Sequence, residues 1–229
     1  MTRFVGIDPA TQTGFVALDE NGGPLVEVAF RGKGINIPGG ISPTQRVSLQ
    51  NQLYSLLRPG DIILKEGVAN GNMRLITTSK IHGGLEDMIT RKGLRYDEVA
   101  PLSVKKFVDV NMRNIDKSLK GIEKEKAKKA EMAAAALKHF GYSNPSHDIV
   151  DAYIIARICE AVYRVRKRQK TLDDFHLEYQ REVIWSIIDP VGYKEYEKTK
   201  KKKSKSTKRR GKPAAADSHT QMTEQQFLF

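Results

Sequence analysis

The chain has 229 residues, a single cysteine and a formal net charge of +12. This length fits one domain with extensions, or at most two small domains, and it can bury a core without disulfides. Because Cys159 is the only cysteine, a disulfide within the chain is excluded and a cysteine-based zinc site is disfavoured. No apolar run approaches the roughly 20 residues that span a bilayer, and the N-terminus lacks a signal-peptide layout, so we expect a soluble, cytoplasmic protein.

The N-terminal half predicts three closely spaced strands, a helix and a fourth strand. Turn chemistry between the first three strands indicates an antiparallel meander. The helix has an apolar stripe, and the strand after it is short and apolar. The expected strands are Thr2–Ile7, Gly14–Leu18, Leu25–Phe30 and Asp61–Lys65, and the expected helix covers about Thr44–Leu57.

The second half predicts helices and one more strand. A polar loop with several lysines precedes an alanine-rich segment, which is a strong helix former. The expected helices are Leu75–Arg91, Glu123–Phe140 and one from a cap at Asn144 or Ser146 to about Arg168, with a strand within residues 94–101. This mixed order favours an α/β sheet covered by helices. We assign residues 1–170 to this domain and residues 171–197, with an amphipathic pattern, to a helical extension.

The positive charge is concentrated near the C-terminus. Residues 198–212 contain ten Lys or Arg and no acid, which leaves about +2 for the rest of the chain. We expect residues 198–229 to be a disordered basic tail, because this segment has no core-forming pattern. Such a tail adds salt-dependent, non-specific attraction to nucleic-acid phosphates. Alternatively, it is a solvated tail or a localisation-like run.

Four acidic residues end or interrupt apolar elements. Asp8 ends the first strand and Glu66 ends the fourth. Asp148 and Asp151 stand three residues apart in the first turns of the last core helix, so they share a helix face. Sites in α/β sheets cluster where strand ends meet helix starts, and we therefore expect the four carboxylates to converge. Hard cations such as Mg²⁺ or Mn²⁺ compensate such a cluster, and two of them can clamp a phosphodiester during its displacement.

Each acid also has a structural interpretation. Asp8 before Pro9 can start a turn, and Glu66 before a glycine can be a solvent-facing loop acid. Asp148 can complement the helix macrodipole. Asp151 is harder to explain in this way, because its neighbours on both sides are apolar. The site hypothesis therefore rests on the joint placement of the four acids.

The motifs "FVGIDPATQTGFVALD", "IILKEGV" and "SHDIVDAYIIA", in this order and spacing, resemble the RuvC Holliday junction resolvases of the ribonuclease H-like superfamily. The resemblance spans about Arg3 to Arg168. It implies a ribonuclease H-like α/β fold whose five-stranded mixed sheet has three antiparallel and two parallel strands, flanked by helices. It also implies a crossover junction endodeoxyribonuclease with two Mg²⁺ or Mn²⁺ ions in each active site. The catalytic, metal-binding residues of the family correspond here to Asp8, Glu66, Asp148 and Asp151.

The resemblance further implies a homodimer that cuts a four-way DNA junction symmetrically, leaving a 5′-phosphate and a 3′-hydroxyl. The helix over Leu75–Arg91 would build much of the dimer interface. His147 corresponds to a position where some relatives have a histidine, and it is otherwise a partly exposed residue at a helix start. The candidates for contacts with the DNA backbone are Lys105, Lys106, Lys117 and Lys120, each of which is alternatively a solvated surface lysine.

Two departures from the family pattern bear on the substrate. Bacterial relatives carry an aromatic residue shortly after the strand-four Glu, where this chain has Ala69 and Asn70. The chain also continues well past the last core helix. Selectivity for junctions over flaps or forks is therefore in question, and the departures suit a version carried by a phage.

Two other classes of protein share part of the pattern. The segment "GIDPATQTG" is similar to the first phosphate loop of actin-like sugar kinases, but this chain is too short for the second nucleotide-binding half. A non-catalytic DNA-binding adaptor tethered to a sliding clamp has no use for four convergent carboxylates. A metal-dependent nuclease for branched DNA accounts for more of the sequence than either alternative.

The chain ends in "QQFLF", which is similar to the peptides by which replication proteins dock on sliding clamps. Gln225, Leu228 and Phe229 match that pattern. A flexible tether raises the effective concentration of such a peptide, and a few apolar anchors carry its binding.

Deleting residues 225–229 is expected to abolish binding to a replication sliding clamp, because the apolar anchors are lost. Surface plasmon resonance with the full-length and shortened proteins measures this, and cleavage of naked DNA serves as the control. Unchanged clamp binding by the shortened protein would refute the docking hypothesis.

Overall fold

The structure is a computed structural model that describes residues 2–38, 40–68, 75–110, 115–116 and 118–210. Its sheet has the strand order β3-β2-β1-β4-β5 within these residues. Strands β1, β2 and β3 pair in an antiparallel manner, and β1, β4 and β5 pair in parallel. The strands are β1 (Phe4–Asp8), β2 (Gln12–Leu18), β3 (Pro24–Arg31), β4 (Ile62–Glu66) and β5 (Tyr96–Val99). This mixed sheet confirms the predicted fold class.

The helices also follow the predicted order. They are α1 (Pro43–Leu56), α2 (Leu75–Arg91), α3 (Pro101–Phe107), α4 (Gly121–Phe140), α5 (His147–Arg166), α6 (Glu178–Ile188) and α7 (Pro190–Arg210), with a short 3₁₀ turn at Leu172–Asp174. Helix α3 lies in the segment expected to be a polar loop. Val104 and Phe107, three residues apart, share one face of this helix and are both buried. The two lysines between them make the segment look polar in the sequence.

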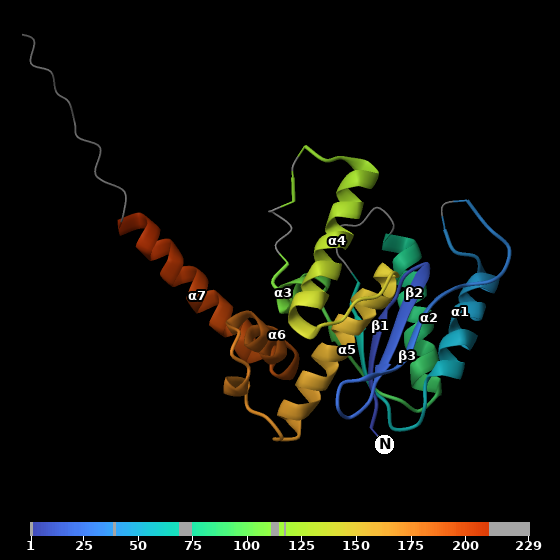
Figure 1. Cartoon of the computed structure of the whole chain (residues 1–229), viewed down its shortest axis with the longest axis horizontal. Coiled ribbons are helices and arrows are strands. Elements are labelled where there is room, and N and C mark those ends of the chain that lie inside the picture. The colour runs from blue at the N-terminus through green and yellow to red at the C-terminus, as the bar shows by residue number, and fades with distance from the viewer. Residues whose placement is uncertain (1, 39, 69–74, 111–114, 117, 211–229) are drawn as a thin grey trace, which may run out of the picture. The chain divides into compact units, whose positions relative to one another are not determined.

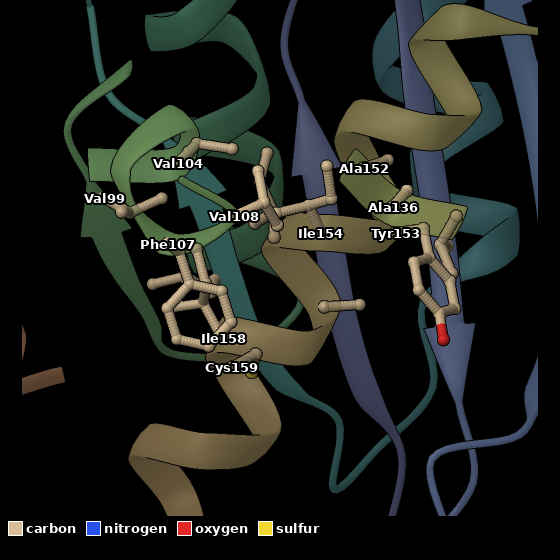
Figure 2. Close-up of a cluster of buried hydrophobic side chains, with 14 of the residues drawn as sticks. Val99, Val104, Phe107, Val108, Ala136, Ala152, Tyr153, Ile154, Ile158 and Cys159 are labelled. Atoms are coloured by element: carbon tan, nitrogen blue, oxygen red, sulfur yellow. The ribbon is translucent and has the colours of Figure 1, made fainter. Parts of the chain in front are cut away.

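The sheet has helices on both faces (Figure 1). Strand residues alternate between the faces, so Val5 and Ile7 of β1 pack toward α1 and α2, while Phe4 packs toward α5. The core on the α5 side also includes residues from α3, α4 and α6. Figure 2 shows part of this core, in which Ile154 and Ile158 of α5 lie close to Val108 and Phe107 at the end of α3.

Helix α5 packs directly on the backbone of β1 and β2. A Cβ atom added to Gly6 would lie 2.1 Å from the backbone oxygen of Ala152 and 2.4 Å from the backbone nitrogen of Ala156. A Cβ atom added to Gly14 would lie 1.9 Å from the backbone oxygen of Asp148. Glycine in the strands and alanine in the helix thus let the two backbones meet. This close approach brings the N-terminal turns of α5 to the ends of the strands.

The described residues from Val191 to Arg210 belong to a second unit of the chain. Within it, α7 extends to Arg210, although the sequence predicts no regular structure beyond residue 197. Lysine is a good helix former, and an ion pair between Lys201 and Glu197 supports the helix one turn apart. The predicted clamp peptide, as well as Lys117, Ala69 and Asn70, lies outside the described residues.

Among the described helices, none combines the length and apolar character needed to cross a membrane.

Replacing Gly6 by alanine is expected to lower the free energy of unfolding by about 1–3 kcal/mol, because the new methyl group overpacks the contact with α5. Urea denaturation measures this change. Gly83→Ala is the matched control, since a Cβ atom there meets nothing within 4 Å and the change favours the helix by up to about 1 kcal/mol. Equal stability of the Gly6→Ala and wild-type proteins would contradict the packing account.

Candidate active site

Two of the four predicted carboxylates end neighbouring strands. Strands β1 and β4 pair in parallel and in register, so their last residues, Asp8 and Glu66, reach the same edge of the sheet. Both side chains continue the alternation toward α5, since Phe4 and Leu64 of the same strands pack on that face. The carboxyl groups of the two residues lie within hydrogen-bonding reach of each other.

The other two carboxylates come from the first turns of α5. Ser146 is the N-cap, and Asp148 and Asp151 follow on one face of the helix. The charges of both residues act on Asp8, which shows that the four predicted acids lie close together. The joint placement inferred from the sequence is therefore present in the fold.

Burial and crowding raise the pKa values of three of these acids. The loss of water raises the pKa of Asp8 well above its usual value, and the charges of Glu66 and Asp151 add to this effect. Burial, followed by the charge of Asp151, raises the pKa of Glu66 to about 7. Burial also raises the pKa of Asp151 to about 6, and Asp148 acts in the same direction. The site therefore resists carrying its full negative charge.

Two lysines flank the acids. Lys105 of α3, one of the predicted DNA-contacting residues, lowers the pKa values of both Glu66 and Asp151. Lys129 of α4 also lowers the pKa of Asp151. The sequence offers no signal for Lys129, because α4 carries several lysines and only the packing brings one of them to the site.

The remaining predicted lysines occupy other surroundings. Lys106 forms an ion pair with Glu182 of α6, with a distance of 2.5 Å between Nζ and Oε2. Lys120 is exposed at the N-cap of α4. Of the described candidates for DNA contact, only Lys105 lies beside the carboxylates.

The acids fit a hard divalent cation in their chemistry. No group of three or more His, Cys, Asp or Glu side chains in the described residues already has an arrangement that could hold a metal ion. The carboxyl groups of Asp8 and Glu66 instead crowd each other, and Asp151 Oδ1 is buried without a hydrogen-bond partner in the described structure. A buried oxygen left in this way costs about 1–3 kcal/mol. A cation with a preference for carboxylate oxygen would remove both this cost and the mutual repulsion.

Asp148 is held by a residue that the sequence analysis did not single out. Gln12 Nε2 donates a hydrogen bond to Asp148 Oδ2, and Gln12 Oε1 accepts one from Arg31 Nε. His147, beside Asp148, lines a cleft together with Gln12, Arg31 and Asp148, and its Nδ1 is buried without a partner in the described structure. The two hydrogen bonds of Gln12 have no sequence signature, because they depend on how β2, β3 and α5 meet.

The loop between β1 and β2 has neighbours on both sides. Burial lowers the pKa of His82 of α2, and the backbone of Pro9, directly after Asp8, acts weakly in the opposite direction, so His82 lies beside this loop. The hydroxyl of the fully buried Thr13 donates to the backbone oxygen of Ala10 at 2.8 Å. The loop after Asp8 is therefore hydrogen-bonded to β2 and lies against α2.

Comparisons with known proteins bear on the fold. No protein-family model and no curated protein matches the chain in sequence. RuvC of Thermus thermophilus in complex with a Holliday junction substrate matches in structure with a TM-score of 0.50 and 16% identity, over 73% of this chain and 96% of that chain. A second structure of T. thermophilus RuvC has a TM-score of 0.49 and 14% identity, over 72% and 95%. The first match confirms a RuvC-like fold.

The raised pKa values predict that the metal-free protein loses stability as the pH rises. Below about pH 4 these acids are protonated in both the folded and the unfolded chain, so their burial carries no charge and their contribution to the stability of the folded protein is complete. It is lost as the pH rises through about 6 and 7, the values for Asp151 and Glu66. At pH 8 in EDTA, Asp8→Asn is expected to raise Tm by about 5 °C, because the neutral amide removes the cost of either protonating or ionising a buried carboxyl group beside three other acids.

Differential scanning calorimetry with and without Mg²⁺ checks this expectation. Mg²⁺ is expected to raise the Tm of the wild type more than that of Asp8→Asn. Asp173→Asn removes an exposed acid and should behave as the wild type in both conditions. An Asp8→Asn protein that is less stable than the wild type in EDTA would show that the acids do not repel one another.

Proposed function

We propose that this protein is a metal-dependent endonuclease that cleaves branched DNA, with the Holliday junction as its principal substrate. The observation that carries the proposal is the convergence of four carboxylates at the ends of β1 and β4 and the start of α5. Acids with strongly raised pKa values in one cluster are typical of functional sites. The RuvC-like fold supports the same function, since the matching RuvC structure contains a Holliday junction substrate.

The chemistry needs divalent ions, which the four acids would hold. When bound, Mg²⁺ or Mn²⁺ generates a nucleophile from water at neutral pH and offsets the charge that develops on the phosphodiester. The residues that would hold the two ions are Asp8, Glu66, Asp148 and Asp151. Lys105 and Lys129 flank these acids and are suited to binding the phosphates of the strand to be cut.

A homodimer would give two active sites, one for each of two opposed strands of a four-way junction. The start of α2 supports this part of the proposal, because its side chains Leu75 and Ile76 are 40% and 73% exposed. Large apolar side chains at the surface are suited to contact with a second copy of the chain. Analytical ultracentrifugation of the wild type measures the oligomeric state.

A broader nuclease for flaps and forks is the second candidate. It is favoured by Ala69 and Asn70, which stand where bacterial relatives have an aromatic residue. Comparing the cleavage rates of four-way, flap and linear duplex DNA of equal length in Mg²⁺ distinguishes the two. A preference for the four-way junction supports the resolvase, while equal rates on flap and junction support the broader enzyme.

Asp151→Asn is expected to reduce cleavage of a synthetic four-way junction by about a thousandfold, because it removes one charged group from the centre of the site. Binding of the same junction should be retained. Single-turnover cleavage in Mg²⁺ and a gel-shift assay in EDTA measure the two properties. Asp173→Asn, an exposed acid outside the site, is the matched control. Cleavage by Asp151→Asn at the wild-type rate would overturn the proposed site.

A further inference from the structure

Three side chains form a directional chain of hydrogen bonds that ends on Asp148. Gln12 begins β2 and Arg31 ends β3, and the two residues are direct cross-strand partners. Arg31 Nε donates to Gln12 Oε1 at 2.5 Å, and Gln12 Nε2 donates to Asp148 Oδ2. Arginine has only donors and a carboxylate has only acceptors, so the amide of Gln12 is fixed in one orientation. The pairing of two strands thereby determines the position of one carboxylate oxygen.

Arg31 lies where two clefts meet. The clefts have volumes of about 640 and 320 Å³, and both are lined by Thr11 and Arg31. The larger cleft reaches Lys129 and Asp148, and the smaller one continues along the loop before α1. The two clefts are therefore adjacent, and together they define a path from this loop to Asp148.

The lining of this path suits a nucleic-acid backbone. Among its described lining residues, Asp148 is the only acid, while Arg31 and Lys129 are cations. Amide and hydroxyl side chains supply further donors, for example Asn36 and Gln45. Phosphates and sugars are bound by this combination of cations, amides and hydroxyl groups.

The guanidinium of Arg31 has donors to spare. An arginine side chain has five N–H groups. Within the described residues, the Arg31 side chain makes one hydrogen bond, which Nε donates to Gln12. The side chain is exposed. Its two terminal nitrogens can therefore hold a phosphate in a bidentate manner while Nε keeps its bond to Gln12.

We propose that Arg31 binds a phosphate of the DNA strand that enters the active site and, through Gln12, holds Asp148 in its working orientation. This inference rests on the proposed function and names the path of the substrate strand. In it, Arg31 is a phosphate-binding residue and Gln12 is a positioning residue. If the hydrogen bonds of Gln12 only joined β2 to α5, their loss would lower stability but would change neither DNA binding nor the response to metal.

DNA binding tests the role of Arg31. The binding of a four-way junction is measured in EDTA, at several salt concentrations, in proteins that also carry Asp151→Asn. Arg31→Ala is expected to weaken binding about tenfold, the loss of one charge-assisted contact, and to reduce the salt slope by about 1. Gln12→Ala should bind within about twofold of its parent. Lys33→Ala is the matched control, since Lys33 is a nearby exposed cation that lines neither cleft.

The response to Mg²⁺ without DNA tests the role of Gln12. The Mg²⁺ concentration that gives half of the maximal rise in Tm is expected to increase about tenfold in Gln12→Ala, the scale of losing a residue that orients a metal ligand. Arg31→Lys keeps the charge but loses the planar Nε donor, so it should bind DNA well and share part of this metal defect. In cleavage assays, Gln12→Ala should lower kcat at an unchanged KM, and Arg31→Ala should raise KM.

Two outcomes would overturn the inference. One is an equal loss of DNA binding in Arg31→Ala and Lys33→Ala, which would mean only general charge attraction. The other is an unchanged Mg²⁺ midpoint in both Gln12→Ala and Arg31→Lys. The proposed function fails separately, if the wild type binds branched DNA but cleaves none of the substrates in Mg²⁺.

Discussion

The close approach of α5 to the backbone of β1 and β2 is the constraint on which the candidate site depends. Gly6 and Gly14 have no side chain to separate the strands from the helix, and Ala152 and Ala156 are small enough to let the helix settle. Because the contact is between backbones, the first turns of α5 lie directly over the ends of the strands. Two acids from a helix and two from parallel strands thereby reach one place, although they are far apart in the chain.

The same contact removes water from acids that repel one another. Asp61 is a buried acid with full hydrogen bonding, in contrast to the acids of the site. It accepts two hydrogen bonds from the Arg3 guanidinium, at 2.8 and 2.7 Å, and one from the backbone of Arg58. Asp151 has an oxygen without any partner in the described structure, and its pKa is raised to about 6. A fold that pairs one buried acid fully and leaves another short of partners is consistent with a site built for a cation.

The order of most strands and helices along the chain and the four acids could be predicted from the sequence because both leave local signals. Strands alternate with turn residues, and an acid such as Asp151 stands out among apolar neighbours. The sequence does not predict helix α3, because Lys105 and Lys106 stand between its two buried residues and make the segment look like a polar loop. Gln12, Arg31 and Lys129 were also missed, because a polar residue at a strand end or on a lysine-rich helix looks like any surface residue. Their partners become visible only when the strands and helices are placed together.

The central claim is that the four carboxylates jointly hold divalent cations. Anomalous diffraction from crystals grown with Mn²⁺ tests it directly, because the signal locates the metal without reference to activity. The account predicts a strong anomalous peak between Asp8 and Asp151, with carboxylate oxygens at about 2–2.5 Å from the ion. A fully loaded crystal with no peak at this place, or with Mn²⁺ bound only elsewhere, would contradict the account.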